Sequence, residues 1–277
     1  MKVHFFDNRV FKIFLQITSV VSASLSTLLL FVEIPDDSKT LSLAIFAIVL
    51  SVIYIAVWIW SNRLNQVKIK IDGTTVTIKA GDIFEQPGFK AIAFNEYFDT
   101  QVDNQIISEA SLNGIFLNSH LDIPVTELDK KIEDFRLDDD EIIGVNDSRL
   151  NGKLKKHRLG TIVVYNDYLL AAMSKFDDSN RATLTMPEYL EFLIRFWDRV
   201  NKVYAQKSVA TPIFGSGITR IKGHKNISDE DLLKIMLWTF RISEMRFKYP
   251  ANLSIIIHSD KIDQINLLDI KLLGNGV

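Results

Sequence analysis

Two long apolar runs open the chain, at residues 13–32 and 41–60. Each run is 20 residues long and contains no Asp, Glu, Lys or Arg. At a rise of about 1.5 Å per residue, each would form a helix of about 30 Å, which matches the hydrocarbon core of a bilayer. The first run exceeds the apolar part of a secretory signal peptide and the second follows at once, so we prefer two spans to a cleaved signal. The pattern predicts a two-helix transmembrane hairpin over residues 1–65.

Beyond residue 65 the hydrophobic pattern changes to short elements. Alternating or short buried runs predict strands at residues 67–71, 74–79, 91–94, 159–165, 168–173, 208–214 and 253–257. Helical spacing predicts helices at residues 124–135 and 260–268, and after the capping residues Thr185 and Ser228. Because strands and helices alternate late in the chain, we expect residues 66–277 to form one layered α/β domain.

Polar residues interrupt the first apolar run. Ser19, Ser22 and Ser26 fall at helical spacing on one face, and Ser22 and Ser26 form a pair that lets helix backbones approach closely. The stripe is open to two interpretations. It packs the two helices of the hairpin together, or it lines a pore, which would require several subunits because two helices enclose none.

The flanking charges predict how the hairpin is oriented. Basic residues lie outside both runs: Lys2, Arg9, Lys12, Arg63, Lys68 and Lys70. The connector at residues 33–40 is acidic on balance. Since basic flanks stay in the cytoplasm, we expect an inner-membrane protein with two spans and both termini cytoplasmic.

The overall composition excludes several classes of site. The chain has 32 basic and 34 acidic residues, so its charge balance gives no indication of a nucleic-acid partner. It has no cysteine, which excludes disulfides, thiolate catalysis and cysteine-ligated metals. Its five histidines are scattered outside any metal-ligand spacing. We therefore predict no metal and no cofactor.

Three loops carry candidate binding chemistry. Residues 211–218 form a hydrophobic strand that runs into Gly215 and Gly217, whose freedom of φ lets backbone N–H groups point at a phosphate. Asp82 follows a strand and could accept a hydrogen bond from an adenine amino group. Asn95 ends another strand and could hold a ribose hydroxyl. Each has a plainer alternative, since all three positions also suit tight turns.

Together, in this order, these segments resemble a macro domain. That family folds as a three-layer α/β/α sandwich and binds ADP-ribose at its strand ends, and the resemblance covers residues 67–270. It implies that Asp82 and Ile83 contact the adenine and that Asn95 contacts the far ribose. It also implies that the diphosphate is wrapped by Gly215, Ser216, Gly217 and Ile218.

With the hairpin included, the chain resembles the membrane-anchored ThsA effectors of the Thoeris antiphage system. The likeness lies in residues 81–83, 94–100, 111–114, 169–176 and 212–220. It implies that a TIR-domain enzyme makes an NAD-derived signal of ADP-ribose type, a histidine conjugate. The macro domain of a homo-oligomer would bind that signal, and the membrane part would then disrupt the membrane and cause abortive infection.

One segment departs from the macro-domain pattern. Where macro domains have three successive glycines, this chain reads Ser111-Leu112-Asn113-Gly114. We keep Asn113 and Gly114 as binding candidates. The departure disfavours plain ADP-ribose as the preferred ligand, and it disfavours the hydrolase activity of some macro domains.

We expect a sensor rather than an enzyme, because no nucleophile–base arrangement is visible in the sequence. The acidic run at residues 138–141 is typical of a solvated surface, and His157 lies in a basic stretch that we interpret as an exposed turn or an anion-attracting patch. Two alternatives stay open: a membrane-tethered ADP-ribosyl hydrolase, and a scaffold whose domain binds only protein.

Overall fold

The computed structural model describes residues 2–177, 180–217, 219–224, 226–248 and 250–273. By contacts between residues, the chain forms two compact units. One contains residues 1–67 together with 263–276, and the other contains residues 68–262. The C-terminal segment therefore belongs to the same unit as the N-terminal helices.

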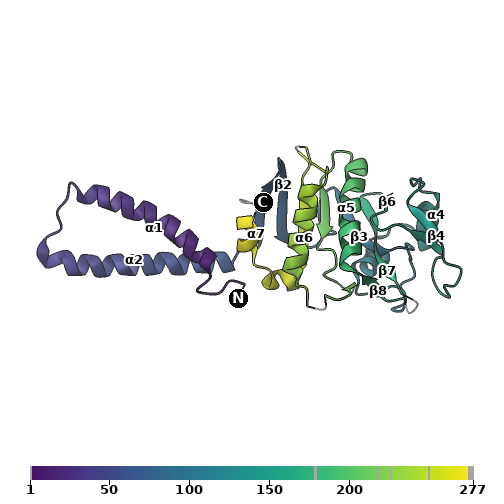
Figure 1. The fold of residues 1–277 in the computed structure, drawn as a ribbon, viewed down its shortest axis with the longest axis horizontal. Helices are drawn as coiled ribbons and strands as arrows, with labels where there is room; N and C mark the ends of the chain where they lie inside the picture. The colour runs from purple at the N-terminus through teal and green to yellow at the C-terminus, as the bar shows by residue number, and fades with distance from the viewer. Residues whose placement is uncertain (1, 178–179, 218, 225, 249, 274–277) are drawn as a thin grey trace. The chain divides into compact units, whose positions relative to one another are not determined.

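The N-terminal unit is built on two long helices, α1 (Asn8–Leu29) and α2 (Asp36–Asn62) (Figure 1). The Asp7 carboxylate caps α1 by accepting a 2.8 Å hydrogen bond from the Arg9 N–H. Asp36 and Asp37 occupy the first turn of α2, where negative charge suits the helix dipole. The two predicted helices are thus confirmed.

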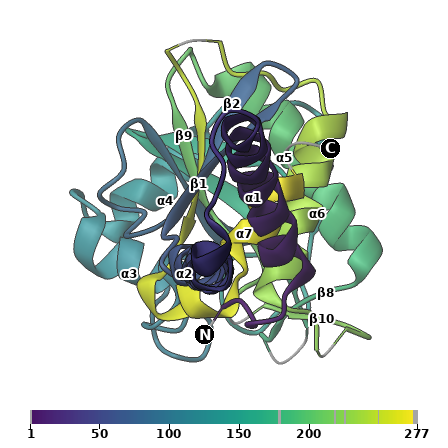
Figure 2. The same cartoon turned by 90° about the vertical axis from the view of Figure 1, so that its left-hand side faces the viewer.

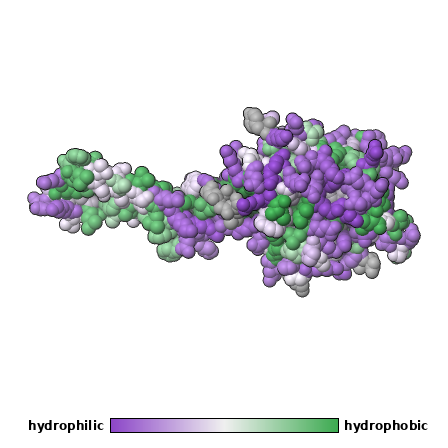
Figure 3. All heavy atoms as spheres, turned by 45° about the horizontal axis from the view of Figure 1, so that its top comes forward, coloured by the Kyte–Doolittle hydropathy of each residue, from purple (hydrophilic) through white to green (hydrophobic). Residues whose placement is uncertain are grey.

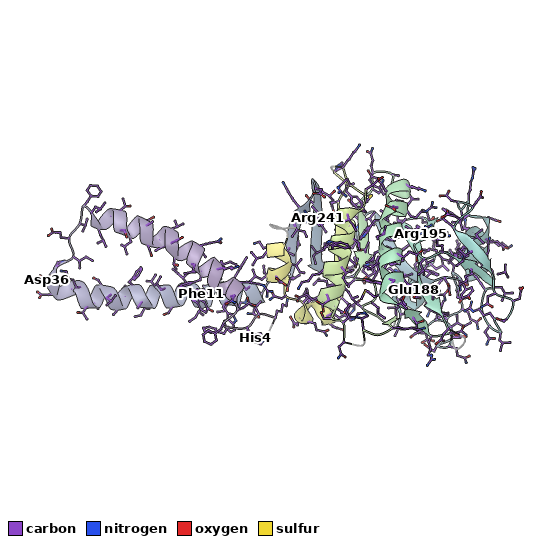
Figure 4. The ribbon with its side chains drawn as sticks, in the orientation of Figure 1. His4, Phe11, Asp36, Glu188, Arg195 and Arg241 are labelled. Carbon is purple, nitrogen blue, oxygen red and sulfur yellow. The ribbon has the colours of Figure 1, made fainter. Side chains whose placement is uncertain are left out.

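Both helices are long and apolar enough to cross a membrane. Only 6% of each apolar stretch is buried, which distinguishes them from the core helices of soluble proteins. Hydrophobic residues cover much of the hairpin surface in Figure 3. Side chains such as Phe11, 48% exposed, project from α1 in Figure 4. Exposed apolar surface of this extent favours contact with lipid.

The serines of the α1 stripe differ in their exposure to solvent. Thr18 is buried and donates a 2.9 Å hydrogen bond to the Phe14 carbonyl, and Ser22, one turn later on the same face, is half-buried. Ser19 and Ser26 are exposed. Only part of the stripe therefore packs inside the hairpin, and its exposed part is available for contacts outside it.

The second unit is centred on a mixed sheet whose described strands run in the order β1-β2-β11-β9-β3-β7-β8-β10, with β6 also paired to β7. Their bounds are β1 (Gln66–Ile71), β2 (Thr74–Ala80), β3 (Phe89–Asn95), β6 (Ile162–Tyr165), β7 (Tyr168–Phe176), β8 (Ala182–Leu184), β9 (Val209–Pro212), β10 (Arg220–Ile221) and β11 (Leu253–Ile257). The central strands β2, β11, β9, β3 and β7 are mutually parallel. All the predicted strands are present, with end points shifted by a few residues.

Helices cover both faces of this sheet. Figure 2 shows α3 (Leu112–Ile115) and α4 (Val125–Asp134) on one side of the strands, and α5 (Met186–Val203) and α6 (Asp229–Ile242) on the other. A π-helical turn, Phe116–His120, continues α3. The arrangement is a three-layer α/β/α sandwich, as expected.

Each face of the sheet has its own core. On the α3–α4 side, Phe94 of the sheet packs with Phe116, Leu128 and Ile132. On the α5–α6 side, aromatic rings meet edge to face, with Phe192 and Phe196 both 4.9 Å from Phe214. This second core fixes the strand end that leads into the predicted glycine loop.

Two sequence interpretations are corrected here. The acidic run is not simply solvated, because Glu141 is 1% exposed and pairs at 2.9 Å with Arg199 of α5. Asp138 and Asp140 also pair with α5, through Arg199 and Arg195. His157 is buried rather than exposed, because β5 (Lys155–His157) pairs with β4 (Ile142–Val145) in a ribbon that the sequence pattern did not reveal.

The predicted closing helix also differs in form. Residues 260–268 are divided between a 3₁₀ helix, Ser259–Gln264, and helix α7 (Leu267–Leu273). Asn266 separates them, because its side-chain oxygen accepts hydrogen bonds from the N–H groups of Leu268 and Asp269 and so starts a new helix.

Candidate ligand site at the carboxyl edge of the sheet

The sheet topology brings the predicted loops to one edge. Strands β2, β9 and β3 are parallel members of one sheet, so the segments that follow Ala80, Pro212 and Asn95 all leave from its carboxyl edge. β2 and β3 are successive strands of the chain, yet β11 and β9 lie between them. Ligands of open α/β sheets bind at this edge, where the strand order changes direction.

The first loop begins at Gly81, whose N–H donates to the Ile257 carbonyl of β11 at 3.0 Å. Asp82 is exposed, and one of its carboxylate oxygens accepts a 2.8 Å hydrogen bond from the Phe84 N–H. The turn-closing role expected of Asp82 is therefore real, while its carboxylate still faces solvent. Ile83 is buried and packs against Ala210 of β9 and Ile256 of β11.

The segment that replaces the glycine run joins the same apolar cluster through Leu112. Ser111 caps α3 by accepting a 3.0 Å hydrogen bond from the Gly114 N–H. A Cβ atom on Gly114 would lie 2.2 Å from the Ser108 carbonyl oxygen, so the glycine allows a close backbone approach. Asn113 is buried, and its side-chain oxygen has no hydrogen-bond partner within the described part of the chain.

The predicted phosphate loop directly continues β9. The Phe214 carbonyl accepts a 2.8 Å hydrogen bond from the Tyr189 hydroxyl, and Gly215 has φ +85°, which favours glycine. The Ser216 carbonyl accepts a hydrogen bond from the Lys261 ammonium. A Cβ atom on Gly217 would meet no described atom within 4 Å. Ile218 lies outside the described residues.

Asn95 has the turn-closing role that the sequence left open. It is 4% exposed, and its side-chain oxygen accepts hydrogen bonds from the N–H groups of Tyr97 and Asp99 at 3.0 and 3.3 Å. Its amide donates to the Asp99 carboxylate at 2.9 Å. The polar atoms of Asn95 are thus engaged within the protein, and its contact with a ribose stays a prediction.

Arg149 is the residue of this region that sequence reasoning missed. Its guanidinium pairs with the Asp99 carboxylate at 2.6 Å, and both side chains are nearly inaccessible, at 7% and 1% exposed. The same guanidinium lies 4.0 Å from the centre of the Tyr97 ring. No local pattern could reveal this contact, because it depends on the chain folding back through the β4–β5 ribbon.

Beyond Asn95, the Glu96 carboxylate at the end of β3 contacts Phe176 of β7 and Lys156 of β5. Burial raises the pKa of Glu96, although Lys156 and the Phe176 N–H oppose that shift. Burial also lowers the pKa of His157, whose ring contacts the Glu96 carbonyl oxygen at 3.1 Å. His157 thus contacts the backbone of Glu96, while the Glu96 carboxylate pairs with Lys156 at 3.3 Å.

The predicted residues fall into two groups. The apolar cluster of Ile83, Ala210 and Ile256 joins the Asp82 loop, the Leu112 segment and the strand that leads to Gly215. Asn95 ends the strand next to β9. A shallow depression of about 700 Å³ lies beside the starts of α5 and α6, and none of the predicted residues line it. Its lining consists of Met186, Gly223, His224, Asn226, Ile227 and Asp231.

The described residues contain no group of three or more His, Cys, Asp or Glu side chains placed to hold a metal ion. The carboxyl edge of the sheet offers three kinds of group to a ligand. It has an exposed carboxylate, a buried amide oxygen and a glycine loop with free space at Gly217.

Comparisons with known proteins agree with this fold. The family model described as the macro domain of Thoeris protein ThsA matches residues 76–258. Thoeris protein ThsA from Bacillus amyloliquefaciens (strain Y2) is 37% identical over 265 residues, which cover 93% of this chain and 87% of that protein.

Solved structures of a macrodomain from Oceanobacillus iheyensis are more distant. A single-residue mutant of it has a TM-score of 0.48 at 13% identity, covering 76% of this chain and 95% of that one. A structure of the macrodomain with ADP has a TM-score of 0.47 at 16% identity, covering 76% and 98%. On the family model and the Bacillus relative, this chain belongs to the ThsA family of Thoeris proteins and carries a ThsA macro domain behind two apolar helices.

Proposed function

We propose that this protein is a ligand-gated membrane effector of Thoeris antiphage defence. Its macro domain binds an NAD-derived nucleotide of ADP-ribose type at the carboxyl edge of the sheet. The observation that carries the proposal is the cluster of Ile83, Ala210 and Ile256, which joins the loops assigned to the adenine and the diphosphate.

Each segment has a definite part in this proposal. The exposed Asp82 carboxylate accepts a hydrogen bond from the adenine amino group, and Ile83 provides an apolar contact for the ring. The loop of Gly215, Ser216, Gly217 and Ile218 holds the diphosphate, with space for it beside Gly217. The unpaired oxygen of Asn113 accepts one further ligand donor, which would offset the cost of its burial.

In this proposal the response takes place in the inner membrane, with both termini cytoplasmic. The two long apolar helices and their basic flanks support it. A TIR-domain enzyme makes the signal, a histidine conjugate of ADP-ribose, and binding leads to membrane disruption and abortive infection.

Shifting a closed–open equilibrium of the effector from 1:99 to 99:1 requires the ligand to bind the open state about 10⁴-fold more tightly than the closed state, or by about 5.5 kcal/mol. A homo-oligomer shares that requirement among several ligand sites.

Calorimetry on the full-length protein tests the binding part, with ADP-ribose and its amino-acid conjugates as titrants. Gly217→Asp places a carboxylate in free space beside the proposed diphosphate, so the variant should fold. Like-charge repulsion should weaken binding about 100-fold, which corresponds to about 2.7 kcal/mol. Gly217→Ala is the matched control and should bind as the unaltered protein does. Equal affinity of the Gly217→Asp variant would place the ligand elsewhere.

The same preparation separates a sensor from a hydrolase. We expect stoichiometric binding of the conjugate and no release of free ADP-ribose from an ADP-ribosylated substrate. Multiple turnovers would instead make the protein a membrane-tethered hydrolase. Absence of binding heat with every titrant would favour the protein-binding scaffold.

A further inference from the structure

The segment that follows β11 makes a specific contact with the proposed diphosphate loop. Lys261, in the 3₁₀ helix Ser259–Gln264, donates a hydrogen bond to the Ser216 carbonyl. Its ammonium also lies 3.1 Å from the Asp229 carboxylate at the start of α6. One cation therefore ties the 3₁₀ helix both to the glycine loop and to the helix beside it.

The continuation of this segment makes specific contacts with the base of the hairpin. Leu268 of α7 is fully buried and packs with Val3, Val10 and Val57. The Asp269 carboxylate lies 2.8 Å from the Arg9 guanidinium in the first turn of α1. Helix α7 thus contacts both apolar helices where they begin and end.

Only Ile265 and Asn266 separate the 3₁₀ helix, which contacts the glycine loop, from α7, which contacts the hairpin. After the 3₁₀ helix the chain passes Asn266, whose side chain is bonded to the N–H groups of Leu268 and Asp269. A short, internally bonded segment transmits a displacement better than a flexible loop does. The same stretch of chain therefore contacts the glycine loop through Lys261 and the hairpin through Leu268 and Asp269.

We propose that residues 259–273 form the element that transmits ligand binding to the membrane hairpin. This inference rests on the proposed function, because it assigns regulation to the same glycine loop. An incoming diphosphate offers Lys261 anionic oxygens, which bind an ammonium more strongly than the neutral Ser216 carbonyl does. The 3₁₀ helix then moves with Lys261, and α7 changes its contacts with Arg9 and Val10. The ligand's differential affinity for the two positions of Lys261 supplies the driving force.

Hydrogen exchange on the full-length protein in nanodiscs tests this inference. In the unaltered protein, the histidine conjugate of ADP-ribose should change amide exchange in residues 267–273 and 8–12. Without ligand, Lys261→Met should raise exchange in residues 267–273 about threefold, the effect of losing a partly exposed ion pair. It should also abolish the ligand-induced change. Lys207→Met is the matched control, because it breaks a similar 3.1 Å pair with Asp167 and should leave α7 unchanged.

A charge exchange tests the contact with the hairpin. Asp269→Arg alone should remove the response of residues 8–12, and combining it with Arg9→Asp should restore it. Exchange in α7 that is insensitive to both the histidine conjugate of ADP-ribose and Lys261→Met would overturn the inference. So would a response of residues 8–12 that persists in the Asp269→Arg variant.

The two proposals fail separately. If ADP-ribose and its conjugates show no binding heat, the proposed function is wrong. The ligand-free arm with Lys261→Met still decides whether the glycine loop and α7 are coupled.

Discussion

Two glycines of the candidate site differ sharply in what surrounds them. A Cβ atom on Gly114 would lie 2.2 Å from the Ser108 carbonyl oxygen and 3.0 Å from the Glu109 Cα. Gly217 has no described atom within 4 Å of that position. We predict that Gly114→Ala lowers the free energy of unfolding by about 1–3 kcal/mol, as overpacking does. Gly217→Ala should change it by less than about 0.5 kcal/mol.

Thermal unfolding of the purified protein in detergent, followed by near-ultraviolet circular dichroism, measures both effects. Equal unfolding temperatures for the two variants would show that the backbone at Ser108 yields easily. In that case the glycine kept at position 114 would have to be explained by the ligand rather than by packing.

At the residue scale, the sequence predicted features that depend on residues a few positions apart, but not contacts between distant segments. The turn positions of Asp82 and Gly215 could be predicted, because a turn residue that follows a strand is visible within a few positions. The pairing of Asp99 with Arg149 was not, since it joins side chains from segments that no spacing rule connects. One of the Asn95 hydrogen bonds goes to the Asp99 carboxylate of that same pair, so the two possible roles of Asn95 could not be separated from sequence alone.

At the element scale, the N-terminus of α5 makes a prediction about pH. Thr185 and Glu188 form the expected capping box, and Lys175 pairs with Glu188 at 2.7 Å. Figure 4 shows Glu188 near one end of α5, with Arg195 farther along it. Burial alone would raise the pKa of Glu188, but the hydrogen bonds from Lys175 and Thr185 together lower it to about 2.

Because the folded pKa lies below the ordinary value of 4.5, the ionised Glu188 stabilises the fold above that pH. The contribution is lost as pH falls from 4.5 towards 2. We predict that Glu188→Gln costs about 1 kcal/mol at pH 7, because it removes a partly exposed ion pair while a glutamine at this position can still cap the helix. The difference from the unaltered protein should shrink steadily below pH 4.5.

Denaturant unfolding between pH 7 and pH 3 measures this difference. Glu133→Gln, at an exposed glutamate of α4, is the control and should differ little from the unaltered protein at every pH. A Glu188→Gln deficit that stays constant as the pH falls would mean that the capping geometry, not the charge, stabilises α5.

Elements with a strong local signal were predicted, and those that depend on distant partners were not. Both capping boxes, at Thr185 and Ser228, begin helices as expected. The β4–β5 ribbon escaped notice because β4 is exposed along its whole length and shows no alternation of burial. The order of the strands was also hidden, since β11 reaches the position between β2 and β9 from the far end of the chain.

At the scale of the whole molecule, the exposed apolar helices carry the clearest consequence. Water-facing helices of a soluble protein would show polar residues on their exposed face, but large hydrophobic side chains are exposed along α1 and α2. The hairpin was predictable from sequence because a helix that crosses lipid needs about 20 consecutive, predominantly apolar residues. Its contact with the C-terminal helix α7 was not, since it depends on residues from opposite ends of the chain.

A charge placed near the middle of α2 distinguishes a lipid environment from water. Ile48 lies near the middle of α2 and is 63% exposed. In a bilayer, Ile48→Lys should oppose insertion by about 2.5–3.5 kcal/mol, so the variant should be lost from the carbonate-washed membrane fraction or degraded. Ile48→Ala, which keeps the position apolar, should fractionate as the unaltered protein does. If α2 instead faced water, a lysine at so exposed a position would cost almost nothing and would improve solubility. An unchanged or higher yield of soluble, folded Ile48→Lys protein would therefore contradict the membrane assignment, and with it the coupling of ligand binding to membrane disruption.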